Sequence, residues 1–128
     1  MVPYVTKTQH SLQLLSQLLL QRAFDYQDEA LCQQQICEFL TTQGVTFEAE
    51  FRLDSSNRID FYFPISKIGL EIKASKKWSK ARVYRQVERY CGFPEIRGLI
   101  LATGRAQGLP SPVNGKPVRV LHLGVAHL

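Results

Sequence analysis

The segment FEAEFRLDSSNRIDFYFPISKIGLEIK, residues 47–73, decides the fold that we expect. Apolar and polar residues alternate along it, and such alternation over roughly four to eight residues is typical of a half-buried β-strand. The pattern predicts strands over residues 47–53, 58–63 and 70–74, separated by turns over residues 54–57 and 64–67. Three strands joined by two short turns predict an antiparallel meander.

The residues before this segment have the spacing of helices. Leucines at helical intervals occupy positions 12, 15, 18 and 19. A second apolar stripe over residues 28–43 ends at Gly44, a typical C-terminal cap. We therefore expect the part over about residues 8–44 to be mainly helical.

After the meander, the pattern predicts one more helix and two more strands, over residues 77–91, 99–102 and 118–123. The resulting element order, α, α, β, β, β, α, β, β, predicts an α/β fold. In that fold a central mixed sheet, the antiparallel meander plus further strands, is flanked by helices. The 128 residues are expected to form one domain, with a helical part over about residues 8–44 and a core over about residues 45–123.

Charge is distributed unevenly along the chain, whose net charge is +5. Residues 1–50 contain two basic and six acidic side chains, whereas residues 51–128 contain fourteen basic and five acidic ones. The basic part is a candidate nucleic-acid surface, although an excess of cations also serves solubility alone.

The cysteines and the apolar runs indicate the compartment that we expect. The three cysteines form no CxxC pair and have no histidine at zinc-site spacing, which predicts reduced thiols in a cytoplasmic protein. The leucine-rich run over residues 12–20 is broken by Gln13, Ser16 and Gln17. We therefore expect neither a signal peptide nor association with a membrane.

Two acidic residues of the meander are expected to lie opposite each other. Counting back along both strands from the turn over residues 64–67 pairs Asp60 with Glu71, on one face of the sheet. Opposed like charges at such short range are destabilising, so a cation is expected between them. Mg²⁺ or Mn²⁺ would suit Asp60, Glu71 and the backbone carbonyl of Ile72 as ligands.

Lys73 follows Glu71 by two residues and therefore emerges on the same face of its strand. An ammonium at this position can orient an attacking water and stabilise the charge on a phosphate. The alternative is an ordinary surface strand with salt-bridging charges, because alternating charge is common on a solvated sheet face.

Two motifs in this order resemble a nuclease family. Arg58-Ile59-Asp60, ten intervening residues and Glu71-Ile72-Lys73 resemble the PD-(D/E)XK nuclease superfamily, with Ile59 in place of its proline. Gln86-Val87-Glu88-Arg89-Tyr90 resembles the Gln-x-x-x-Tyr motif of the branch that includes recombination exonucleases and many phage nucleases. The resemblance covers roughly residues 29–123 and implies a restriction-endonuclease-like core.

The resemblance implies further roles for single residues. Gln86 would contact the metal-bound water or the DNA end, although a satisfied core amide is the alternative. Many members add a helical glutamate to the metal site, but the matching position here is Gln33. Glu29, one turn earlier on the same stripe, or Glu50 on the first strand could replace it.

Cations cluster around the predicted third helix and suggest a track for backbone phosphates. The expected DNA-binding residues are Lys76, Lys77, Lys80, Arg82, Arg85, Arg89 and Tyr90. A merely solvated helix face is the alternative. Trp78 could stack on a base or anchor the helix, and the second role is the more common one.

These observations together predict a Mg²⁺-dependent deoxyribonuclease with Asp60, Glu71, Lys73 and Gln86 in its active site. The chain has no room for a separate target-recognition domain, so we expect selection by DNA structure, as in junction resolvases, or by a partner protein. A homodimer is expected only by analogy with other small nucleases. The alternative function is a catalytically inactive DNA-binding or assembly protein with the same fold.

Overall fold

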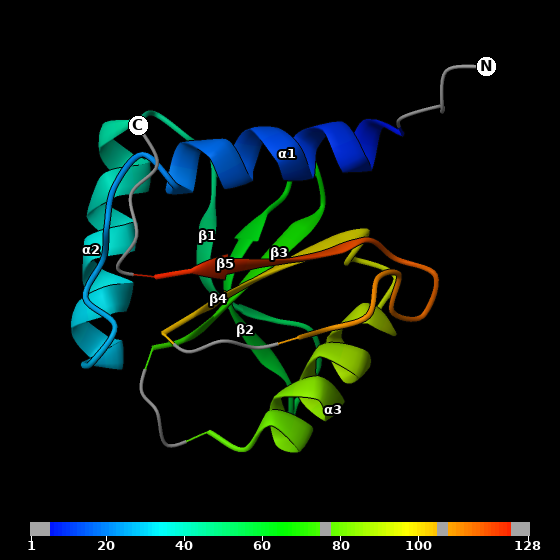
Figure 1. Cartoon of the computed structure of the whole chain (residues 1–128). Helices are drawn as coiled ribbons and strands as arrows, with labels where there is room; N and C mark the ends of the chain where they lie inside the picture. The colour runs from blue at the N-terminus through cyan, green and yellow to red at the C-terminus, as the bar shows by residue number, and fades with distance from the viewer. Residues whose placement is uncertain (1–5, 75–77, 105–107, 124–128) are drawn as a thin grey trace.

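The computed structural model describes residues 6–74, 78–104 and 108–123. Within these ranges it contains three helices and five strands (Figure 1). In chain order they are α1 (Lys7–Leu19), α2 (Glu29–Thr42), β1 (Glu48–Arg52), β2 (Arg58–Phe63), β3 (Ile68–Lys73), α3 (Lys80–Cys91), β4 (Gly98–Thr103) and β5 (Val118–His122). The order of helices and strands agrees with the one predicted from the sequence.

The five strands form one mixed sheet in the order β1-β2-β3-β4-β5. β1, β2 and β3 are the antiparallel meander, whereas β4 and β5 pair in parallel with their neighbours. α3 makes the crossover from β3 to β4, which a parallel pair requires. The α/β class with a central mixed sheet flanked by helices is thereby confirmed.

Local signals in the sequence account for the helix ends. Thr6 forms a capping box with Gln9 at the start of α1, and the side chain of Asp28 accepts a hydrogen bond from the Leu31 N–H at the start of α2. α2 ends just before Gly44, whose φ of +72° lies in the left-handed region that favours glycine. Ser79 caps α3 in the same way as Asp28 caps α2.

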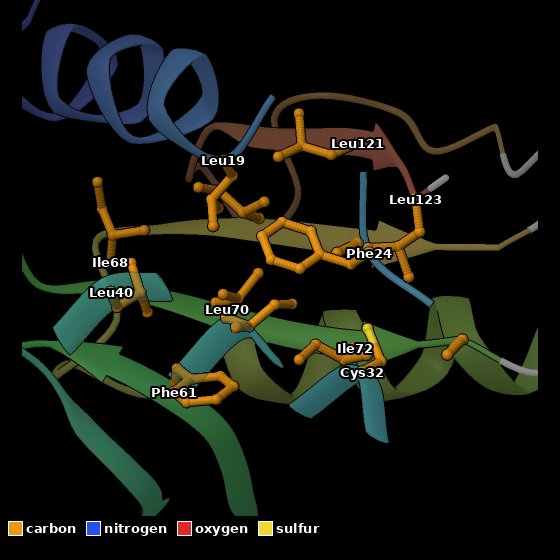
Figure 2. Close-up of a cluster of buried hydrophobic side chains, with 14 of the residues drawn as sticks. Leu19, Phe24, Cys32, Leu40, Phe61, Ile68, Leu70, Ile72, Leu121 and Leu123 are labelled. Atoms are coloured by element: carbon orange, nitrogen blue, oxygen red, sulfur yellow. The ribbon is translucent and has the colours of Figure 1, made fainter. Parts of the chain in front are cut away.

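Two hydrophobic clusters sandwich the sheet between layers of helices. One cluster lies between the sheet and the helices α1 and α2, and Figure 2 shows how Leu70 and Ile72 of β3 meet Cys32 and Leu40 of α2 in it. The other cluster lies between the opposite face and α3, which is on the far side of the sheet from α1 (Figure 1). Because side chains alternate along a strand, Glu71 and its neighbours at odd positions face the α3 side.

The regular alternation breaks at the middle of β2. Ile59 packs in the cluster under α3, but Phe61, two residues later, packs in the cluster under α1 and α2. β1 changes faces opposite this point, because Phe51 pairs with Ile59 whereas Phe47 packs beneath the helices α1 and α2. Glu50 lies at the change, with a left-handed φ of +54°. The backbone of β2 is therefore turned where Asp60 sits.

The length and composition of the described helices decide whether any of them could cross a membrane. None of them has both the length and the apolar composition that a bilayer crossing needs. The longest of the three, α2, has 14 residues.

Candidate active site

Asp60 occupies a place in the β2–β3 ladder that a backbone carbonyl would normally fill. Its Oδ2 accepts a hydrogen bond of 2.8 Å from the Ile72 N–H, and its own N–H donates to Glu71 Oε1 at 3.3 Å. The register agrees with the sequence-based count, because the Phe61–Leu70 pair places Asp60 opposite Glu71. The two carboxylates meet, but the Asp60 carboxylate lies between the backbones of β2 and β3. It does not lie beside Glu71 on one face of the sheet. The turned backbone of β2 explains the difference.

Glu71 and Lys73 form a buried ion pair on the α3 side of the sheet. Lys73 Nζ lies 3.0 Å from Glu71 Oε2, and the residues are only 6% and 3% exposed. The same ammonium lies 3.9 Å from the centre of the Trp78 ring, a cation–π contact. Lys73 is thus held between a carboxylate and an indole at the C-terminal end of β3.

Burial raises the pKa of both carboxylates, and repulsion from Asp60 adds to the rise at Glu71. Burial raises the pKa of Glu71 to about 8, with a further upward contribution from Asp60 and an opposing one from Lys73. Burial also raises the pKa of Asp60, although the hydrogen bond from the Ile72 N–H opposes this rise. With both groups ionised, one ammonium leaves a net negative charge in a poorly solvated place. An additional cation would relieve that excess.

Gln33 of α2 completes the environment of Asp60. Its Nε2 donates to Asp60 Oδ1 at 3.1 Å, so the helix position where a glutamate was sought holds an amide that orients the aspartate. Each of the four carboxylate oxygens of Asp60 and Glu71 accepts one hydrogen bond. Each oxygen has a second lone pair, so these contacts still permit coordination of a metal.

The donor atoms around Asp60 fit a hard divalent cation. The carbonyl of Lys73 accepts a hydrogen bond from Gly104 on the β4 side, whereas the N–H of Ile72 points to Asp60 on the β2 side. Because the N–H and C=O of one strand residue project to the same side, the Ile72 carbonyl also points toward Asp60. Two carboxylates and a carbonyl are the hard oxygen ligands that Mg²⁺ accepts alongside water.

A third acidic ligand is not in place. In residues 6–74, 78–104 and 108–123, no three acidic, histidine or cysteine side chains converge closely enough to hold a metal. Glu29 is the nearer candidate, since burial raises its pKa while Lys73 and Asp60 both act on it. Glu50 points elsewhere: its side chain is 64% exposed and lies 3.9 Å from Arg58. The assignment of Glu50 to the metal site does not fit this geometry.

Gln86 and Tyr90 bond to each other on the inner side of α3. Gln86 Nε2 donates to the Tyr90 hydroxyl at 2.8 Å, and this hydroxyl donates to the Arg58 carbonyl at 2.9 Å. Tyr90 is only 2% exposed, and burial raises its pKa. This burial argues against the direct DNA contact expected of Tyr90. Its ring anchors α3 to β2 two residues before Asp60.

The flank of α3 that carries Arg82, Arg85 and Arg89 forms a basic groove beside the ion pair. The groove has a volume of about 420 Å³ and is lined by Trp78, Arg82, Val83, Arg85, Gln86 and Arg89. Lys80 begins α3 and is also exposed. Lys76 and Lys77 lie outside the described residues, so their expected DNA contacts have no structural account.

Comparisons with models of protein families, with curated proteins and with solved structures find no match. The geometry of the site itself therefore carries what can be inferred about function. Sequence reasoning identified Asp60, Glu71 and Lys73, which the structure brings together. It missed the contact of Gln33 with Asp60 and that of Trp78 with Lys73. The sequence held no signal for the Gln33 contact, because it depends on how α2 packs on the sheet.

Proposed function

We propose that this protein is a divalent-metal-dependent DNA nuclease with a restriction-endonuclease-like core of the PD-(D/E)XK kind. The observation that supports the proposal is the buried arrangement of Asp60, Glu71 and Lys73 at the junction of β2 and β3. Its residue types and their order match the motif that resembles this superfamily.

The energetic cost of this arrangement argues for a functional role. Burying an ion pair costs desolvation that the mutual attraction seldom exceeds by much, and a second carboxylate adds repulsion. A structural role would be served equally well by apolar side chains of similar volume. Strongly shifted pKa values beside a groove, as at Glu71, are typical of functional sites.

In the proposed mechanism, Asp60, Glu71 and the Ile72 carbonyl would hold the cation. When bound, Mg²⁺ would polarise the scissile phosphate and increase the acidity of a water. Gln33 fixes the orientation of the Asp60 carboxylate. The Lys73 ammonium, held by Glu71 and Trp78, donates a hydrogen bond to the attacking water or to a phosphate oxygen.

The reaction is hydrolysis of a phosphodiester. The water oxygen forms a bond to phosphorus, and the bond from phosphorus to one sugar oxygen breaks. One water proton ends on that leaving oxygen and the other passes to solvent. Lys73 stabilises the negative charge that builds up on the phosphate during this exchange.

Selection of the substrate by DNA structure or by a partner protein is part of this proposal, as is a homodimer for cutting both strands. The groove beside α3 offers guanidinium groups for backbone phosphates, which attract DNA regardless of its sequence. An inactive DNA-binding protein with the same fold would bind DNA but would not cleave it.

A comparison of wild type with Asp60→Asn tests the proposal. Plasmid, single-stranded, forked and four-way-junction DNA should be cleaved by the wild type with Mg²⁺ or Mn²⁺ and left intact when EDTA is present. Metal should raise the Tm of the wild type by binding the folded state, and Asp60→Asn should lose both the cleavage and the rise. Glu38→Gln, which neutralises an acid on the same helix as Gln33, is the matched control.

Two outcomes would contradict the proposal. An equal metal-induced rise in Tm for wild type and Asp60→Asn would remove the metal site. DNA binding without metal-dependent cleavage of any of the four substrates would favour the inactive DNA-binding protein.

A further inference from the structure

The groove beside α3 combines an aromatic ring with cations. Trp78 lines it together with the guanidinium-bearing residues Arg82, Arg85 and Arg89, and the buried side chain of Val83 contributes to its floor. We propose that this groove binds an unpaired nucleotide of a DNA strand, with the base against Trp78 and the flanking phosphates on the three arginines.

The chemistry of the lining favours a nucleotide over a bare phosphate backbone. A duplex backbone needs only exposed cations along its path, and such cations require no concave surface. An indole next to guanidinium groups is instead the combination that binds single strands, where the ring stacks on a base and the cations follow the backbone. The volume of about 420 Å³ is also in the range of ordinary small-ligand sites.

The base must be unpaired to reach this groove. In a duplex, each base is stacked on both faces and its edge alone is exposed in the grooves. A nucleotide in a single strand, a fork or a frayed end presents its face at much lower cost. The groove would thus distinguish DNA by local structure and not by sequence, because every base has a face that can stack.

Trp78 joins this groove to the ion pair. Its ring lies 3.9 Å from Lys73 Nζ, and Lys73 lies 3.0 Å from Glu71. Because Lys73 occupies one face of this ring, a base would stack on the other face, and its adjoining phosphate would lie near the ion pair. This step rests on the proposed nuclease function, and it gives that function a substrate class: DNA with an unpaired nucleotide beside the phosphate to be cut.

The fluorescence of Trp78 reports binding directly, since it is the only tryptophan in the chain. The wild-type protein should be titrated in EDTA, where cleavage does not interfere, with oligothymidylate and with a blunt duplex of equal length. We expect saturable quenching by the single strand and much weaker quenching by the duplex. Abasic sites in the single strand should weaken binding by about 5- to 100-fold, as expected for loss of one base–aromatic stack.

Substitutions of Trp78 provide a second measurement, made by the anisotropy of a labelled oligonucleotide. Trp78→Phe should keep most of the affinity for the single strand, whereas Trp78→Leu should lose about 5- to 100-fold. Affinity for the duplex should stay unchanged in both variants. Tyr84→Leu, which removes an aromatic ring of α3 that does not line the groove, is the control.

Equal quenching by single strand and duplex would overturn the inference, and so would full affinity for the abasic strand. The abasic experiment needs no variant, so a folding defect in Trp78→Leu leaves it intact. All binding is measured without metal. A negative result in these binding experiments therefore does not test the nuclease proposal, which the Asp60→Asn experiment tests. A negative result in the Asp60→Asn experiment does not contradict nucleotide binding.

Discussion

Lys73 can act by screening Glu71 or by stabilising charge on a phosphate, and the two roles predict different consequences of its removal. It neutralises Glu71 at 3.0 Å and would stabilise charge on a bound phosphate. With Mg²⁺ present, Lys73→Ala should lower the cleavage rate by about 10²-fold, the scale for loss of one electrostatic stabiliser, while DNA affinity changes little. Single-turnover cleavage and Tm measurements with and without metal check this prediction.

A role in screening alone would give a different pattern. Lys73→Ala would then lose stability without metal, because Glu71 loses its buried partner, and Mg²⁺ would restore both the Tm and nearly the full cleavage rate. Lys7→Ala, which removes an exposed cation at the start of α1, is the matched control.

The raised pKa of Glu71 makes stability and metal binding depend on pH. The pKa rises from the ordinary 4.5 to about 8 in the folded protein. The stabilisation by the bound proton is thus complete below the lower value and is lost as pH rises through the upper one. We predict that the metal-free Tm falls over this window relative to Glu71→Gln. The Mg²⁺-induced rise should grow over the same window, because metal must displace the proton.

Scanning fluorimetry across this pH range, with EDTA and with Mg²⁺, makes the measurement. Glu71→Gln mimics the protonated side chain and should show a smaller change of Tm with pH. If the Tm values of the wild type and of Glu71→Gln changed with pH in the same way in EDTA, the raised pKa of Glu71 would be contradicted.

Single residues of the site differ in how far sequence could locate them. A hairpin has a fixed register once its turn is known, so counting placed Asp60 opposite Glu71 correctly. The hydrogen bond from Gln33 to Asp60 spans 27 positions and depends on how α2 packs on the sheet. Neither periodicity nor spacing in the sequence predicts how α2 packs on the sheet. Gln33 could therefore not be identified as the residue that orients Asp60.

At the scale of elements, Tyr90 links α3 to β2. Its hydroxyl donates to the Arg58 carbonyl and accepts from Gln86, all in a poorly exposed environment. Tyr90→Phe should lower the free energy of unfolding by about 1–3 kcal/mol, because the Arg58 carbonyl and the Gln86 amide lose a partner. It should also slow cleavage while DNA affinity stays unchanged. Denaturant unfolding and DNA titration check this prediction.

A direct role of Tyr90 in DNA binding would appear as a loss of affinity with little loss of stability. Tyr84→Phe removes a hydroxyl from a less buried tyrosine of the same helix and provides the comparison. The distinction matters because the Gln-x-x-x-Tyr resemblance alone could not say whether Tyr90 faces DNA or the core.

The strands show why element prediction succeeded and face prediction failed in one place. Period-two alternation in the sequence located β1 and β2, although burial along them does not alternate: four of the five β1 residues are exposed, and the last three residues of β2 are all buried. It also placed Glu50 on the face of Asp60, because it assumes that the alternation never breaks. The left-handed φ of Glu50 and the divided packing of Ile59 and Phe61 violate that assumption. No glycine marks the break, so the sequence contains no signal for it.

At the scale of the whole molecule, the layers separate the charges that are uneven along the chain. α2, which contains Glu29 and Glu38, lies with α1 on one face of the sheet, and the arginine-rich α3 covers the other (Figure 1). A uniform mixture of acidic and basic side chains would have weakened the attraction of the α3 face for DNA. The sandwich instead leaves the basic groove of α3 beside Lys73, so DNA is expected to approach from this side.

This arrangement predicts which arginines determine the salt dependence of DNA binding. Arg85 and Arg89 line the groove, and Arg89 also lies 3.4 Å from the Asn57 side chain, which extends the basic surface toward β2. Arg85→Ala and Arg89→Ala should each weaken binding to all DNA sequences alike. The slope of log K against log salt should become shallower by about one for each phosphate that the variant no longer neutralises, because fewer counterions are released. Arg119→Ala removes an exposed arginine of β5 and should leave the slope unchanged. Titrations at several salt concentrations measure the slopes of the three variants and of the wild type. Equal slopes for all four proteins would show that α3 presents only a solvated face.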